Sequence, residues 1–183
     1  DVHAIELGEG AKQVTLSVWD LGGDSAGLPA VQPYLTEGSI YLLAVPALDV
    51  PTLSAGYATY VGQWLDCLHA RAPKAAVLPV LTKCDTLNAA SNPGPEHRTP
   101  SAYSNFASTQ VAWLTEALQR HQSSVPDGGL NIHYPVQCAS ALSGSEAAID
   151  GVKARMSAIV FADGGSVLPS IYQPIPRTIY LTM

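Results

Sequence analysis

The chain has 183 residues, of which 47% are hydrophobic and 13% are charged, and its formal net charge is −6 at pH 7. This size and apolar content suit one domain with a buried core and a tail left over. The acidic balance argues against nucleic acid as a partner, because phosphate binding needs clustered Lys and Arg. No run of about 18 apolar residues exists, so no membrane span is expected. Three widely spaced cysteines without a metal-binding pattern predict reduced thiols in the cytoplasm.

The first third of the chain predicts a hairpin followed by irregular helix and a strand. Apolar and polar residues alternate over residues 2–7 and again over 14–20, around a glycine-containing turn, which is typical of an antiparallel hairpin. Residues 25–35 hold one glycine and two prolines, so any helix there is short. Residues 40–45 form a continuous apolar run, which predicts a strand buried on both faces.

The rest of the chain alternates predicted helices and strands. Apolar residues recur at helical spacing over residues 57–68, 106–118 and 149–160, whereas strands are predicted over 76–81 and 132–138, and loops over 88–104 and 123–129. Pro79 is awkward in a central strand because it cannot donate a ladder hydrogen bond. This order predicts an α/β fold with a mainly parallel sheet and helices on both faces. Ligands of such sheets bind at the carboxyl ends of the strands.

Three short motifs fall at those predicted strand ends. Asp20 follows the strand 14–20 and precedes a glycine turn at Gly23, which is how nucleotide-binding proteins place a carboxylate near Mg²⁺ and a bare N–H near a phosphate. The second motif is TKCD, residues 82–85, and the third is QCASALSG, residues 137–144. Each motif alone is a common turn or a solvated strand end. The three in this order favour nucleotide binding.

WDLGG, YLTEGSIYLLAV, QWLDCL, RAPKAAVLPVLTKCD and QCASALSG, in this order, resemble a Roc domain, the Ras-like GTPase module of Roco proteins. The resemblance covers residues 1–162, and residues 163–183 resemble a proline-rich linker or the start of a COR-like segment. It implies a Ras-like P-loop NTPase fold, incomplete at the amino end. It also implies a guanine-nucleotide-binding module of a larger multidomain protein, regulatory or scaffolding, with slow or absent GTP hydrolysis. Neighbouring domains, a protein assembly or a second copy would be its partners.

The same resemblance implies roles for individual residues. Asp20 would hold Mg²⁺ through water, and Gly23 would give its N–H to the γ-phosphate of GTP. Asp85 would accept two hydrogen bonds from guanine, which selects against adenine. Lys83 would lay its stem along the base, and Ala139 would donate its N–H to the guanine oxygen. Thr82, Cys138 and Ser140 would flank these groups, with Thr82 in place of the commoner Asn.

Two departures leave alternatives open. No GxxxxGK[ST] phosphate loop occurs, and Asp24 stands where Ras-like enzymes often carry a water-orienting Gln. The chain is therefore either part of a GTPase whose phosphate loop lies upstream, with GTP or GDP and Mg²⁺ as cofactors, or a degenerate, nucleotide-free packing module.

A third hypothesis is a serine hydrolase. Residues 23–27 read G-D-S-A-G, and Ser25, Asp85 and His121 or His133 follow in the order of a nucleophile-elbow triad. Finally, Cys84 and Cys138 become neighbours if their two motifs meet. The simpler interpretation is that both cysteines are small buried residues of the core. The alternative is that they form a redox-sensitive pocket.

Overall fold

The computed structural model describes residues 2–8, 13–21, 27–48, 50–84, 100–125, 129–140 and 146–162. Strands β1 (Val2–Leu7) and β2 (Val14–Trp19) pair antiparallel, with Val2 opposite Trp19 and Leu7 opposite Val14. The predicted hairpin is therefore confirmed. It forms a two-stranded sheet of its own, separate from the parallel sheet that follows.

Short helices lead into the parallel sheet, as the prolines and glycine of this segment predicted. The elements in chain order are α1 (Leu28–Val31), the 3-10 turn η3 (Gln32–Tyr34), β3 (Ile40–Pro46), α2 (Val50–Ala55), the π-helical turn η4 (Ala58–Gly62), α3 (Gln63–Arg71), β4 (Ala76–Thr82), α5 (Pro100–Ser124), β5 (Asn131–Ile132), β6 (Gln137–Cys138) and α6 (Glu146–Phe161). Within these residues, no helix has both the length and the apolar character to cross a bilayer.

Strand β4 is the centre of the parallel sheet. Along its whole length it pairs with β3, from Ile40 opposite Ala76 to Pro46 opposite Thr82. On its other side it pairs first with β5 and then with β6, where Leu81 lies opposite Cys138. The predicted strand over 132–138 is thus two short strands with an irregular segment between them.

Pro79 fits this central strand because of that interruption. The carbonyl groups of Val77 and Leu81 accept hydrogen bonds from the N–H groups of His133 and Ala139. The backbone N–H and C=O groups of the odd-numbered residues of β4 therefore face β5 and β6. Pro79 shares that direction, and it lies between the residues paired with β5 and those paired with β6. Its missing N–H therefore costs no ladder hydrogen bond.

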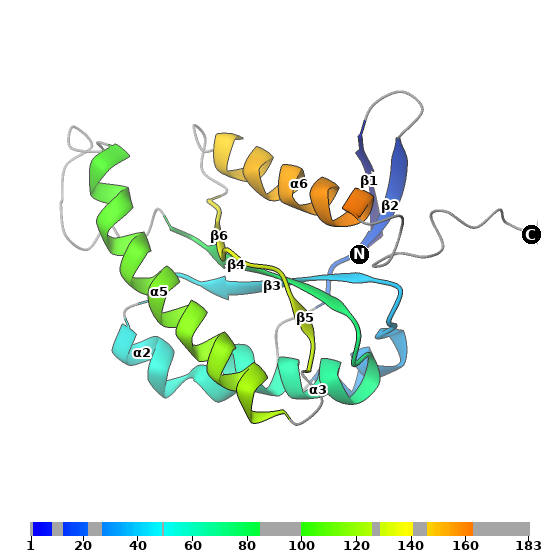
Figure 1. Cartoon of the computed structure of the whole chain (residues 1–183), viewed down its shortest axis with the longest axis horizontal. Coiled ribbons are helices and arrows are strands. Elements are labelled where there is room, and N and C mark those ends of the chain that lie inside the picture. The colour runs from blue at the N-terminus through cyan, green and yellow to red at the C-terminus, as the bar shows by residue number, and fades with distance from the viewer. Residues whose placement is uncertain are drawn as a thin grey trace, which may run out of the picture.

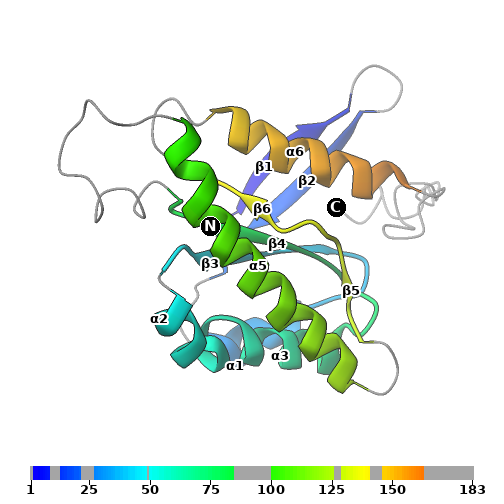
Figure 2. The same cartoon turned by 60° about the vertical axis from the view of Figure 1, so that its left-hand side comes forward.

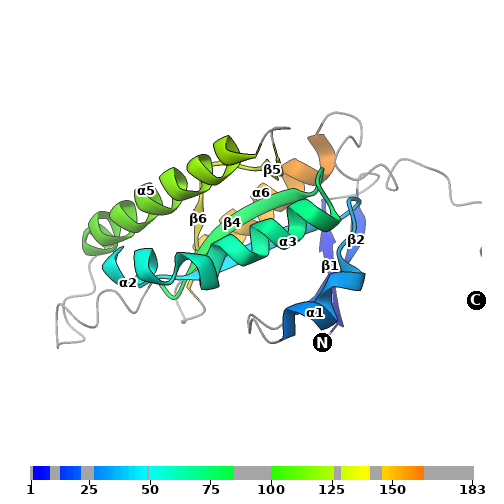
Figure 3. The ribbon, with the colours of Figure 1, turned by 90° about the horizontal axis from the view of Figure 1, so that it is seen from below.

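Helices cover both faces of this sheet, as the sequence predicted (Figures 1 and 2). The side chains of Val77 and Leu81 point into a core shared with α3 and α5. Those of Ala76, Leu78 and Val80 point into a second core, which α6 and the hairpin complete. Seen from below, α3 lies across the sheet with α5 beside it, and the hairpin lies toward the opposite end from α2 (Figure 3).

Strand β3 differs from its prediction as a strand buried on both faces. Leu43 and Val45 are buried against α3, but Leu42 is 42% exposed and Ala44 is also exposed. The reason is that β3 is at the edge of the parallel sheet, and the core formed by α6 and the hairpin reaches only Ile40 on this strand.

Two helix boundaries also differ. Helix α5 begins at Pro100 and α6 at Glu146, several residues before the predicted starts at 106 and 149. The composition of residues 88–104 had indicated a loop throughout. Proline is tolerated in the first turn of a helix, so Pro100 begins α5 instead of excluding it. Residues 85–99 and 163–183 lie outside the described residues, and so does the predicted linker.

Candidate functional site

The carboxyl ends of β3, β4 and β6 lie level with one another. Thr82 ends β4 opposite Pro46, and its carbonyl oxygen accepts the N–H of Ala47 at 2.7 Å. The hydroxyl of Thr82 donates to the carbonyl of Val45 at 3.3 Å. Cys138 ends β6 opposite Leu81. The TKCD and QCAS motifs therefore meet where the parallel strands end, as their predicted positions required. These carboxyl ends of β3, β4 and β6 together form the carboxyl edge of the sheet.

Lys83 gives this edge its particular shape. Its φ is +56°, in the left-handed region that residues with a side chain rarely enter. Among the non-glycine residues that the structure describes, it alone has a positive φ. A conformation of this kind costs roughly 1–2 kcal/mol for an L-residue. It turns the chain back after β4, so that the N–H of Cys84 donates to the carbonyl of Ala139 at 3.4 Å and its thiol contacts the carbonyl of Leu81 at 3.2 Å. The Lys83 side chain remains exposed.

This turn brings the two cysteines together. Cys84 is buried, Cys138 is half-buried, and neither forms a disulfide. A hydrogen bond from the Cys84 side chain lowers the pKa of the Cys138 thiol to about 7, against the opposing effect of its burial. Burial instead raises the pKa of the third thiol, Cys67 on α3. The predicted neighbourhood of Cys84 and Cys138 is confirmed.

The expected role of Ala139 meets a geometric obstacle. Its backbone N–H donates to the carbonyl of Leu81 at 2.8 Å, as a continuation of the pairing between β6 and β4. An N–H used in this way is not available to a ligand oxygen in this arrangement, and the role of Ala139 stays a prediction. Ser140, the next residue, is buried with 8% of its surface exposed.

Asp20 is not brought to this edge. It follows β2 with an exposed side chain, and the ring of the preceding Trp19 lies 5.5 Å from that of Tyr34. Tyr34 belongs to η3, which precedes β3, so Asp20 lies near the beginning of the parallel strands. The sequence order alone had suggested a shared site. The hairpin is a separate sheet, and among the described strands no ladder aligns the end of β2 with the end of β4, so the role of Asp20 stays a prediction.

The remaining predicted residues fall outside the described part of the chain. They are Gly23, Asp24, Ser25 and Asp85. The assembled set is therefore Thr82, Lys83 and Cys138, together with the end of the QCAS segment at Ala139 and Ser140.

Both histidines of the hydrolase hypothesis lie at the opposite end of the sheet. The N–H of His133 donates to the carbonyl of Val77 near the beginning of β4, which is roughly 16 Å from Thr82 at about 3.3 Å per residue. His121 is in the last turn of α5, with its Nε2 3.7 Å from Oδ1 of Asp66 on α3. The directly following residue, Gln122, bonds the carbonyl of Leu130 just before β5. Neither histidine lies at the strand ends that lead to Asp85.

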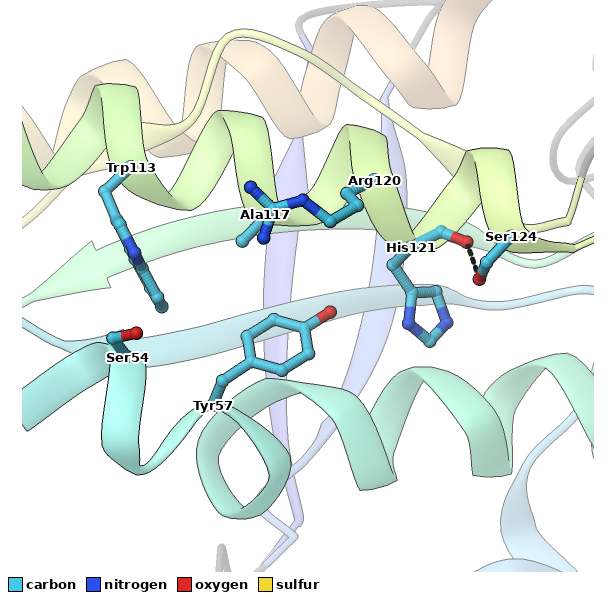
Figure 4. A pocket seen from close by; sticks show the side chains of 7 residues that line it. All are labelled: Ser54, Tyr57, Trp113, Ala117, Arg120, His121 and Ser124. Carbon is cyan, nitrogen blue, oxygen red and sulfur yellow. Dashed lines mark hydrogen bonds between the residues drawn. The ribbon is translucent and has the colours of Figure 1, made fainter.

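A groove between α5 and the α2–α3 segment is a second candidate site, and no sequence motif predicted it. It has a volume of about 380 Å³ and is lined by Ser54, Tyr57, Trp113, Ala117, Arg120, His121 and Ser124. The Tyr57 ring reaches up from the turn before η4 between Trp113 and His121 (Figure 4). Its centroid is 6.2 Å from that of Trp113 in an edge-on arrangement. Only the helical spacing of Trp113 and His121, which puts both on one face of α5, could have indicated this groove.

Two polar atoms in this groove are buried without a hydrogen-bond partner among the described residues. They are the hydroxyl of Tyr57 and Nε2 of His121. Burial, together with the carboxylate of Asp66, raises the pKa of Tyr57, so its hydroxyl stays protonated and can donate. The charges around the groove have both signs, because Arg120 pairs with Glu116 at 2.7 Å on the same helix. The groove therefore offers a hydrogen-bond donor beside aromatic rings without a net charge preference.

Among the described residues, no three His, Cys, Asp or Glu side chains gather as metal ligands. Comparisons with protein-family models, with curated proteins and with solved structures found no match. The class that the structure defines is therefore an α/β protein with a small parallel sheet, helices on both of its faces and an additional antiparallel hairpin.

Proposed function

We propose that this chain is the guanine-binding part of a Roc-type nucleotide-binding module within a larger multidomain protein, with a regulatory or scaffolding role. The observation that carries the proposal is the left-handed turn at Lys83, which directly follows the central strand and packs against the QCAS segment. Backbone strain of this kind is concentrated at functional sites. Ligands of parallel sheets bind at this edge.

The residues at this edge fit the base of a nucleotide better than its phosphates. Lys83 is exposed directly after Thr82, and its aliphatic stem would cover one face of a purine. Asp85 comes directly after the turn, where a carboxylate would accept the two N–H groups of guanine. The carbonyl oxygen of guanine would take its donor from the loop that begins at Ser140, because the Ala139 N–H is engaged.

Phosphate and Mg²⁺ binding need groups that the described residues do not assemble here. Asp20 follows a strand of the separate hairpin sheet, and β3 carries no partner strand on its outer side among the described elements. A parallel strand added there would extend the sheet on its open side. We assign the phosphate loop to such a strand, supplied from elsewhere in the full-length protein. Mg²⁺, when bound, would neutralise phosphate charge.

Binding of fluorescent GDP to the longest natural form of the protein tests the proposal. We expect Asp85→Asn to weaken GDP binding and to favour xanthosine diphosphate, because an amide replaces one acceptor with a donor that matches the second carbonyl of xanthine. Lys83→Ala should also weaken GDP binding, whereas the matched exposed change Lys74→Ala should not. If the folded protein does not bind GDP at millimolar Mg²⁺, the proposal is wrong, and the chain is a packing module that keeps the fold without binding a nucleotide.

The serine hydrolase hypothesis has a separate test. A fluorophosphonate probe should label Ser25 if the G-D-S-A-G segment is a nucleophile elbow. We expect no labelling, because His121 and His133 lie at the beginning of the parallel strands, away from the turn that leads to Asp85.

A further inference from the structure

We propose that Cys84 and Cys138 are a reversible redox pair, in which Cys138 reacts with a hydroperoxide and Cys84 then closes a disulfide across the ends of β4 and β6. The proposal does not depend on nucleotide binding. It rests on the approach of two thiols from different strands and on the different burial of the two side chains.

The backbone holds the two cysteines in a position from which a disulfide can form. Cys138 is the residue opposite Leu81 in the ladder, and Cys84 turns back toward the same ladder through its N–H bond to Ala139. The two side chains interact closely enough for Cys84 to lower the pKa of the Cys138 thiol. An S–S bond is about 2.05 Å long, so closure requires the two sulfur atoms to move closer together. The exposed turn at Lys83 is next to Cys84 and can absorb that movement.

The two thiols are suited to different steps. Cys138 is half-buried, and the Cys84 hydrogen bond lowers its pKa to about 7, so a large fraction is thiolate near neutral pH. Cys84 is 8% exposed and is shielded from solvent oxidants while remaining in contact with Cys138. Cys67 has neither property, because it is buried and its burial raises its pKa. It is therefore an internal control within the same chain.

The chemistry balances with a hydroperoxide as the oxidant. The Cys138 thiolate attacks the terminal peroxide oxygen, the S–O bond forms, the O–O bond breaks, and the leaving oxyanion takes a proton to become water or an alcohol. Cys84 then attacks the sulfur of the resulting sulfenic acid. The S–S bond forms and the S–O bond breaks, and hydroxide leaves as water with the proton of Cys84. The two thiols lose two electrons in total, and a dithiol reverses the change by exchange.

Peroxide treatment of the reduced full chain, followed by denaturation and alkylation of the remaining thiols, tests the pair. We expect intact-mass analysis to show one alkylated cysteine, Cys67, in a chain that has lost two hydrogen atoms, and three alkylated cysteines after dithiothreitol. Cys67→Ser should still lose both other thiols. Cys84→Ser should give a sulfenic acid at Cys138 that dimedone traps, and Cys138→Ser should leave its two cysteines reduced.

A kinetic measurement separates this reactivity from a merely structural role of Cys84. Iodoacetamide should alkylate Cys138 first at pH 7, and Cys84→Ala should slow that reaction on the order of tenfold, because the hydrogen bond that favours the thiolate is lost. Three free thiols after peroxide, a disulfide between two chains, or equal alkylation rates at Cys138 and Cys67 in the folded protein would each overturn the proposal.

Discussion

The hydroxyl of Tyr134 donates to Oε1 of Gln122 at 3.0 Å, whereas the hydroxyl of Tyr57 is buried without such a partner in the described structure. The two tyrosines therefore make a matched pair for measuring the contribution of one hydrogen bond. A satisfied hydroxyl typically adds about 1 kcal/mol to stability, whereas a buried unsatisfied one contributes nothing or opposes folding.

We expect Tyr134→Phe to lower the free energy of unfolding by about 1 kcal/mol and Tyr57→Phe to leave it unchanged or raise it slightly. Urea denaturation followed by tryptophan fluorescence measures both. Equal losses in the two variants would mean that Tyr57 finds a partner that the described residues do not supply, such as an ordered water in the groove.

Lys83 provides a backbone test at the candidate nucleotide site. Glycine has no Cβ and enters the left-handed region freely, so Lys83→Gly should be more stable than Lys83→Ala by about 1 kcal/mol. Both variants remove the lysine side chain beyond Cβ, so their difference reports the cost of the positive φ, reduced by the greater freedom of glycine in the unfolded chain. At Lys74, which has no positive φ, the order should reverse, because glycine gains more freedom in the unfolded chain. Thermal unfolding of the four variants checks both comparisons.

Two leucines in neighbouring strands should differ widely in their contribution to the core. Leu81 in β4 is fully buried, and Leu81→Ala should cost about 2–5 kcal/mol through lost burial and a cavity. Leu42 in β3 is 42% exposed, and Leu42→Ala should cost less than about 1 kcal/mol. Chemical denaturation measures both changes. A large loss at Leu42 would show that another element covers the outer part of β3.

Acid should weaken the fold through His133. Burial, and then the nearby Arg155, lower the pKa of His133 in the folded protein from its ordinary value of 6.5. The unfolded chain therefore binds a proton at a higher pH than the folded one, so this contribution to stability is complete above about pH 6.5 and declines as the pH falls toward the folded pKa. The melting temperature should drop between pH 7.5 and pH 5.5.

Two variants connect that decline to His133. His133→Gln should flatten the pH dependence, and Arg155→Gln should flatten it partly, because Arg155 is the second cause of the lowered pKa. A decline of unchanged steepness in His133→Gln would assign the effect to other groups.

The parts of the fold that depend on local pattern were predictable from the sequence. The alternation in residues 2–7 and 14–19 predicted the hairpin, and the apolar run over 76–81 predicted the central strand. The proximity of Cys84 and Cys138 also followed, because parallel strands end at one edge. These inferences need only the period of the side chains and the direction of the strands.

The features of the fold that depend on how the two sheets and the helices pack against one another were not predictable from the sequence. Nothing in Trp19 or Asp20 indicates that β2 ends beside Tyr34 and not beside Thr82. The exposure of Leu42 and the engagement of the Ala139 N–H are likewise consequences of which elements lie alongside. The groove at Tyr57 arises from the way two helices pack, and packing of that kind leaves no motif in either helix.

The second core joins residues from the two ends of the described chain. Leu7 and Val14 of the hairpin share it with Met156 and Val160 of α6, around the face of β4 that carries Leu78. A two-stranded hairpin is at best marginally stable alone in water. During synthesis, therefore, the hairpin emerges early but has no complete core to join until α6 leaves the ribosome. Until then the apolar face of β4 stays uncovered, and this interval is when the nascent chain is most open to aggregation or to protection by a chaperone.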